Sequence, residues 1–212
     1  MIIQGVAGDI ELVLDLPVSN FTEGSPRAFA VCCHPHPLFG GSLSNKVIDT
    51  VARSFVEAGV PTVRFNFRGV GASQGIHDKG LGELDDLASV VAWGRSKWPG
   101  IPVWLGGFSF GSWVVLRAQA ALSPAILVTI APPVGRWDFS GVSLPLCPWL
   151  IVQGEDDELV NAQAVQVWVN SLGSVAQNCM GQVVLVPKAE HFFHGRLAEL
   201  RAAIMAFITI AA

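Results

Sequence analysis

Charged side chains are scarce in this chain of 212 residues, because Asp, Glu, Lys and Arg together make up only 14% of it. Hydrophobic residues supply 51%, whereas disordered chains show the opposite balance. The formal net charge is −4 and the isoelectric point is near 5.7, so the sequence offers no basic surface for phosphate groups. These shortages exclude a disordered or nucleic-acid-coating chain and predict an ordinary soluble protein with no nucleic-acid partner.

Long uninterrupted apolar runs are also missing, although the mean hydropathy is +0.48. Arg117 is the only charged residue between Pro102 and Val134, but glycine and proline interrupt this stretch, and a membrane-spanning helix needs about 18 unbroken apolar residues. The stretch is typical of strands and a helix buried within a sheet that is covered on both faces. The N-terminus has no charged leader and no cleavage site, so we expect no signal peptide and no membrane insertion.

Cysteine is sparse and shows no spacing typical of metal ligands. The four cysteines are Cys32, Cys33, Cys147 and Cys179. We interpret them as buried thiols in a reducing compartment, which predicts a cytoplasmic location. His34 and His36 flank a proline without a matching carboxylate or cysteine pattern, so we expect no metal at this turn.

Short apolar runs alternate with segments of helical periodicity along the whole chain. The runs that predict strands lie near 13–16, 28–33, 60–67, 103–106, 126–130, 149–152 and 183–186. The segments that predict helices lie near 47–55, 84–91, 113–116, 164–169 and 197–207. This alternation predicts an α/β fold, with a doubly wound, mostly parallel sheet and helices on both faces. No repeat, linker or low-complexity tract occurs, so residues 1–212 are expected to form one domain.

The segment Gly107-Phe108-Ser109-Phe110-Gly111 lies between a predicted strand and a predicted helix. This is the context of a G-x-S-x-G nucleophile elbow, in which a sharp turn forces the serine to a positive φ. The flanking glycines leave room for neighbouring backbone, and the new helix points free N–H groups at the same place. Ser109 is therefore a candidate nucleophile, and it needs a base.

Acidic residues and a histidine follow the last two predicted strands. Asp156 and Asp157 come after the first of these strands, and His191 comes after the second. Parallel sheets gather such side chains at the carboxyl ends of their strands, and the order serine, acid, histidine is the one expected with this elbow. Imidazole can take the serine proton while a carboxylate orients it. Asp156 remains an alternative to Asp157, and His194 an alternative to His191.

Four further segments accompany the GFSFG elbow in the expected order. They are HPHPLFGG at 34–41, RFNFRGVGASQG at 64–75, GEDDELV at 154–160 and EHFFHG at 190–195. Together the five resemble the α/β-hydrolase superfamily, and within it the small lidless bacterial serine hydrolases near the dienelactone-hydrolase-like enzymes. The resemblance implies the α/β-hydrolase fold, no cofactor, and a triad of Ser109, Asp157 and His191. Asp157 is preferred to Asp156 because it matches the acid of the family's G-x-x-D-x-x-V pattern.

The same resemblance implies an oxyanion hole built from backbone N–H groups. The family often has H-G-x-P after its first buried strand, whereas this chain has Pro35 in place of the glycine. His36 is the implied donor with Phe110 as the second, and the departure leaves Leu38 as an alternative to His36. Related turns also imply a cis peptide bond between His36 and Pro37.

Aromatic residues lie close to the candidate catalytic positions in the sequence. Phe39, Phe108 and Trp137 are candidate lining residues of an apolar acyl or aromatic pocket. Only residues 132–147 separate two of the predicted strands where larger relatives of the resembled family insert a cap. This connection is too short for several helices, so we expect an exposed cleft without a lid.

These features predict a serine hydrolase that cleaves a small-molecule ester or thioester by acyl transfer, as a monomer or homodimer. The same triad can serve an amidase, a peptidase or a cofactor-free haloperoxidase, since a fold does not determine the substrate. A non-catalytic ligand-binding homologue is the alternative from a different class. The glycines at 69–75 mimic a dinucleotide loop, but their G-x-G-x-x-x-G spacing does not match that motif.

Overall fold

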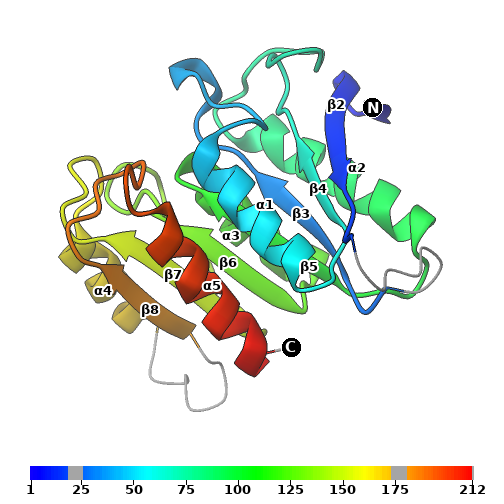
Figure 1. Cartoon of the computed structure of the whole chain (residues 1–212). Helices are drawn as coiled ribbons and strands as arrows, with labels where there is room; N and C mark the ends of the chain where they lie inside the picture. Colours follow the sequence, from blue (N-terminus) through cyan, green and yellow to red (C-terminus); the bar gives the residue numbers. More distant parts are fainter. Residues whose placement is uncertain (19–25, 173–180, 212) are drawn as a thin grey trace.

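An eight-stranded sheet forms the centre of the computed structural model, which describes residues 1–18, 26–172 and 181–211 (Figure 1). Its strands are β1 (Ile2–Gly5), β2 (Gly8–Asp15), β3 (Phe29–Cys33), β4 (Thr62–Phe65), β5 (Val103–Phe108), β6 (Ile126–Ile130), β7 (Trp149–Gly154) and β8 (Gly181–Val186). The strand order is β1-β2-β4-β3-β5-β6-β7-β8. The strands from β4 to β8 in this order run parallel, while β1 and β2 pair antiparallel with their neighbours. The predicted mostly parallel sheet is therefore confirmed.

Helices cover both faces of the sheet, as predicted (Figure 1). They are α1 (Lys46–Glu57), α2 (Leu81–Lys97), α3 (Phe110–Leu122), α4 (Ala162–Ser171) and α5 (Leu197–Ala211), with a 3₁₀ turn, η1, at Pro37–Phe39. α1 and α5 pack on one face, and α2, α3 and α4 pack on the other. No helix in these described segments is long and apolar enough to cross a membrane.

The central strands read as continuous apolar runs because both of their faces are covered. Every residue of β3, β5, β6 and β7 is buried, as expected for parallel strands between two helical layers. Cys32 and Cys33 lie in this core as buried free thiols, and burial raises the pKa of each. Cys147 is also buried, and Cys179 lies outside the described residues.

The strand predicted over 60–67 is shorter than expected, since β4 ends at Phe65. The backbone N–H of Phe67 donates to Nε2 of His34 at 3.0 Å instead of to a neighbouring strand. The glycine-rich segment that follows is anchored by Arg68, whose guanidinium lies 2.8 Å from the buried carboxylate of Asp86 on α2. This segment is thus a packed turn beside the end of the sheet.

Five neighbouring strands end at one edge of the sheet, and their following loops carry the candidate residues. β3 leads to the turn at His34–Pro37, β5 leads to Ser109, β7 leads to Asp157, and β8 leads to His191. β6 ends between β5 and β7 and leads to the segment at 131–148, in which no helix forms. The strand order therefore brings these loops together at one place.

Candidate active site

Ser109 occupies a strained turn between β5 and α3. Its backbone has φ of 51° and ψ of −116°, a region that side-chain-bearing residues rarely adopt. A Cβ on Gly107 would meet the carbonyl of Gly111, and a Cβ on Gly111 would meet the carbonyl of Cys33. Both glycines are therefore required by backbone that passes directly against them, and the turn projects Ser109 above the end of the sheet.

A second serine ties this turn to β6. Ser112 Oγ lies 2.7 Å from the carbonyl oxygen of Gly107 and accepts a hydrogen bond from the N–H of Ile130 at 3.0 Å. The N–H of Ser109 donates to the carbonyl of Ile130 at 2.8 Å. These buried contacts hold the elbow in one geometry, which a strained backbone needs in order to persist.

Ser109, His191 and Asp157 form one line of hydrogen bonds. Nε2 of His191 lies 3.0 Å from Oγ of Ser109, and Nδ1 lies 2.8 Å from Oδ2 of Asp157. The side chains of His191 and Asp157 are 3% and 0% exposed. Because Nδ1 faces a carboxylate, it carries the proton, and Nε2 is left free to accept the proton of the serine.

The acidic partner in this geometry is Asp157, whereas Asp156 is exposed and does not face the imidazole. Oδ1 of Asp157 accepts hydrogen bonds from the N–H groups of Leu159 at 2.9 Å and Val160 at 2.7 Å. Burial acts to raise the pKa of this carboxyl, but the hydrogen bond and charge of His191 and the two backbone donors outweigh it, so the pKa lies below its usual value.

His194, the alternative to His191, lies apart from the serine. Its side chain is exposed and its Nδ1 lies 2.7 Å from Oε1 of Glu190. His191 is held in place through its backbone as well, since its N–H donates to Oε2 of Glu158 at 3.2 Å. This hydrogen bond links the loop after β8 to the loop after β7.

The expectation for Phe108 is wrong. Its side chain is fully buried, and its ring packs against that of His191 at a centroid distance of 5.1 Å. As the last residue of β5 it points into the core on the α1 and α5 face. Phe108 therefore packs behind the histidine and is not a lining residue of the two cavities at Ser109.

Two backbone N–H groups near Ser109 are available as oxyanion donors. Phe110 is the first residue of α3, so its N–H has no acceptor within the helix. The N–H of His36 makes no hydrogen bond to any other described residue, whereas that of Leu38 donates to Nδ1 of His36 at 3.2 Å. The geometry thus favours His36 over Leu38 as the partner of Phe110.

The expected cis bond between His36 and Pro37 is absent, since no cis peptide occurs in the described segments. His36 has φ of −54° and ψ of 123°, the extended conformation that a residue before a trans proline favours. Pro37 then opens η1, where its missing N–H costs nothing.

His34 is a structural residue of this turn. Its Nε2 accepts from the N–H of Phe67, so its Nδ1 carries the proton and donates to the carbonyl of Pro35 at 2.6 Å. Burial lowers the pKa of His34 to about 4. Within the described ranges no group of three or more His, Cys, Asp or Glu side chains is arranged to hold a metal ion.

Two cavities meet at Ser109, with volumes of about 100 and 150 Å³. Both are lined by Ser109, His191, His36, Phe39 and Leu159. The first also reaches Phe110, Pro133, Arg136, Trp137 and Val160, and the second reaches Pro35, Gly40, Gly41, Asn45 and Phe192. No helix covers them from the connection between β6 and β7, so the predicted absence of a lid is confirmed.

Phe39 and Trp137 lie where the sequence predicts pocket residues. Phe39 is 84% exposed and stands at the junction of both cavities. The ring of Trp137 lies 5.0 Å from that of Phe110 and 5.6 Å from that of His36, measured between centroids. These rings form one wall of the smaller cavity.

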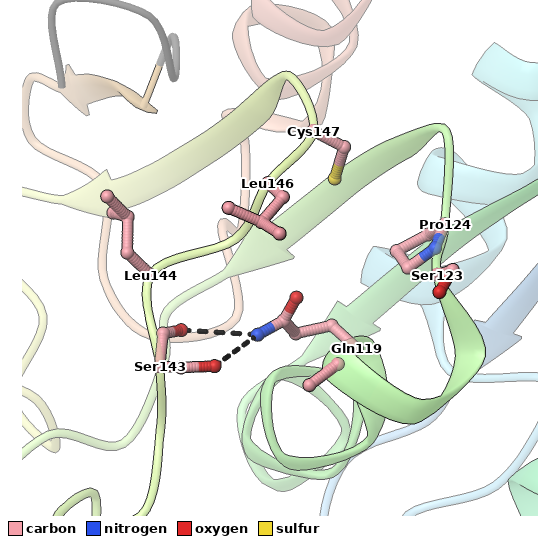
Figure 2. A pocket seen from close by; sticks show the side chains of 8 residues that line it. Gln119, Ser123, Pro124, Ser143, Leu144, Leu146 and Cys147 are labelled. Atoms are coloured by element: carbon pink, nitrogen blue, oxygen red, sulfur yellow. Dashed lines mark hydrogen bonds between the residues drawn. The ribbon is translucent and has the colours of Figure 1, made fainter. Parts of the chain in front are cut away.

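A larger cavity, of about 370 Å³, lies away from the triad (Figure 2). It is lined by the end of α3 and by Ser143, Leu144, Leu146 and Cys147. Figure 2 shows the amide of Gln119 donating to Ser143 among these lining residues. Pro124 and Cys147 on its wall precede β6 and β7. The cavity therefore lies at the opposite edge of the sheet from Ser109.

Gln153 is a site residue that sequence reasoning missed. It lies in β7, its side chain is fully buried, and its Nε2 donates to Oδ2 of Asp157 at 2.8 Å. The sequence does contain one signal for this residue, which is a polar side chain in an otherwise apolar strand. Buried amides are seldom left without a hydrogen-bond partner, so such a residue indicates a polar group nearby.

Comparisons with known proteins find a similar protein, although no family model matches the chain. The chain is 35% identical over 187 residues to the uncharacterized protein RP471 of Rickettsia prowazekii, a match that covers 85% of this chain and 78% of that protein.

Solved structures are also similar over nearly the whole chain. XC6422 from Xanthomonas campestris, described as an α/β serine hydrolase without a lid, is 43% identical with a TM-score of 0.91, covering 99% of this chain and 93% of that one. An α/β serine hydrolase homologue from Coxiella burnetii is 40% identical with a TM-score of 0.90, covering 97% and 95%. The chain is therefore a hydrolase that belongs to the α/β-hydrolase superfamily, among its lidless serine hydrolases.

Proposed function

We propose that this hydrolase is a carboxylesterase-like enzyme that cleaves a small ester or thioester through Ser109, His191 and Asp157. One observation carries the proposal, which is the unbroken line from Ser109 Oγ to His191 Nε2 at 3.0 Å and from His191 Nδ1 to Asp157 Oδ2 at 2.8 Å. This is the arrangement that turns a poor nucleophile into a reactive one.

Acyl transfer can proceed at this site without a cofactor. Nε2 of His191 takes the proton of Ser109 as Oγ attacks the carbonyl carbon, and the N–H groups of Phe110 and His36 stabilise the resulting oxyanion. His191 then gives that proton to the leaving alcohol or thiol as its bond to the acyl carbon breaks. A water molecule, deprotonated by His191, releases the acid and restores Ser109. Asp157 holds the tautomer and stabilises the imidazolium.

The two cavities beside Ser109 suit the two halves of a small ester. Their volumes of about 100 and 150 Å³ are comparable with an engineered cavity of about 150 Å³ that holds benzene. The acyl group and the leaving group would each occupy one of them, with the carbonyl carbon at their junction. A short or aromatic acyl group is the substrate class that fits.

Labelling with a fluorophosphonate probe tests the proposal, because the probe reacts with activated serines. We expect the wild-type protein to gain one covalent adduct on the peptide that contains Ser109, and a short p-nitrophenyl ester to slow the labelling by competition. The Ser109→Ala variant should stay unlabelled. Folded wild-type protein that fails to react would contradict the proposal and favour a non-catalytic binding protein. A screen of esters, thioesters and amides of graded acyl length then separates esterase from amidase activity.

Truncating the aromatic residues at the cleft should change the preferred acyl length. Phe39→Ala and Trp137→Ala remove one wall each, so the ratio of kcat/KM for octanoyl over acetyl esters should shift by about tenfold. Phe39 is exposed, and its loss should leave the free energy of unfolding within about 0.5 kcal/mol of wild type. Leu146→Ala is the matched control, because Leu146 is exposed and lines the distant cavity. An unchanged profile in both aromatic variants would remove these residues from the substrate site.

A further inference from the structure

The side chain of Gln153 reaches the acid of the triad from inside the fold. Its Nε2 lies 2.8 Å from Oδ2 of Asp157, the same oxygen that lies 2.8 Å from Nδ1 of His191. Gln153 lies in β7, and none of its side chain is exposed. It is therefore part of the buried surroundings of the carboxylate and out of reach of any substrate.

The amide has one orientation that its surroundings allow. Its NH₂ group faces Oδ2 of Asp157 and also lies 3.2 Å from the carbonyl of Val160 and 3.3 Å from that of Gly154. Its own Oε1 is buried without a hydrogen-bond partner among the described residues. Turning the amide over would set Oε1 against three acceptors, one of them a carboxylate. The NH₂ group of Gln153 therefore stays hydrogen-bonded to Asp157, and the uncharged Oε1 of the same amide is left without a partner among the described residues.

With this donor, both carboxylate oxygens of Asp157 are doubly hydrogen-bonded. Oδ1 accepts from the N–H groups of Leu159 and Val160, and Oδ2 accepts from Gln153 and His191. Without Gln153, Oδ2 would be held by the imidazole alone, and the plane of the carboxylate would be free to rock about Oδ1. A misalignment at Oδ2 passes directly to the imidazole, and through it to Ser109.

We propose that Gln153 is a positioning residue of the triad, whose amide holds Oδ2 of Asp157 in line with the imidazole of His191. The proposal rests on the proposed serine hydrolase function, since alignment matters only if His191 transfers a proton. Gln153 thus affects turnover without contacting the substrate.

Two variants of Gln153 separate alignment from simple packing. Gln153→Met keeps the size of the side chain and removes the donor, so kcat on a p-nitrophenyl ester should fall by about 10- to 100-fold with KM within about twofold. Gln119→Met is the matched control, because Gln119 is also buried and its amide bonds Ser143 beside the distant cavity. That control should keep the wild-type kcat.

Gln153→Glu tests the donor through its pH dependence. When the new carboxyl is protonated it can donate to Asp157, as the amide does, and when it ionises it repels the neighbouring carboxylate. The kcat of this variant relative to wild type should therefore be highest at the acid end of the profile and fall as the pH rises. A ratio that stays the same at every pH would contradict this role of the donor.

A spectroscopic readout needs no substrate. The proton on Nδ1 of His191 should give a far-downfield NMR signal in the wild type, and this signal should move upfield in Gln153→Met and stay in place in Gln119→Met. Wild-type kcat, pH profile and signal position in Gln153→Met would overturn the proposal, and so would a pH-independent loss in Gln153→Glu if the methionine variant does not fold. Wild-type protein that does not react with a fluorophosphonate would instead contradict the proposed function, while the NMR comparison would still test the contact.

Discussion

Replacing Ser109 with alanine should lower kcat on a short p-nitrophenyl ester by about four to six orders of magnitude. The acyl group would lose its acceptor, because in the described part of the chain no hydroxyl other than that of Ser109 is hydrogen-bonded to Nε2 of His191. Ser112, the nearest serine in the sequence, is buried and bonded to Gly107 and Ile130. The residual rate should come from the oxyanion donors and from binding of the substrate alone.

The fold should survive this substitution, which makes the kinetic result interpretable. Among the described residues, the side chain of Ser109 makes one hydrogen bond, to His191, and alanine keeps the same Cβ at the same positive φ. The melting temperature of Ser109→Ala should therefore stay close to that of wild type. Ser44→Ala, on the exposed turn before α1, is the control and should keep full activity. Turnover above about one percent of wild type in Ser109→Ala would mean that another group is the nucleophile.

Much of the fold is predictable because its central strands are buried on both faces. β3, β5, β6 and β7 contain no exposed position, so they appear in the sequence as apolar runs bounded by turn residues. The end of β4 could not be read in this way. Phe67 is as apolar as the strand before it, and only the ring of His34, which is distant in sequence, shows why its N–H leaves the ladder.

The meeting of Ser109, Asp157 and His191 could be predicted because parallel strands end at one edge, so residues that follow different strands lie close together there. The choice between Asp156 and Asp157 could not follow from topology, since the two are adjacent. It depends on the turn in which Leu159 and Val160 donate to one oxygen of Asp157 and leave the other toward His191.

Side-chain direction was harder to predict from the sequence, as one wrong prediction and one missed residue show. Phe108 neighbours Ser109 but points into the core, because the elbow turns the serine away from the strand that carries the phenylalanine. Gln153 points at Asp157 across a turn of the loop, and nothing in its spacing distinguishes this contact from ordinary burial.

Replacing Asp157 with asparagine should lower kcat by about 10⁴-fold, whereas Asp156→Asn should leave kcat within about twofold of wild type. Asparagine has nearly the shape of aspartate, so the loss of kcat comes from replacing a hydrogen-bond acceptor by a donor. Two backbone N–H groups, of Leu159 and Val160, point at the position of Oδ1, and the amide must turn its oxygen toward them. Its NH₂ group then faces Nδ1 of His191.

That orientation reverses the tautomer of the histidine. Nδ1 must accept from the new amide, so the ring proton moves to Nε2, which then cannot take the proton of Ser109. The NH₂ group of Gln153 would meet the same NH₂ group, and because it also lies against the carbonyls of Gly154 and Val160, it would keep its orientation and lose its bond to residue 157. Kinetics should therefore show a loss in kcat that Asp156→Asn does not share. Equal losses in the two variants, or a loss confined to Asp156→Asn, would contradict the assignment of Asp157 as the acid of the triad.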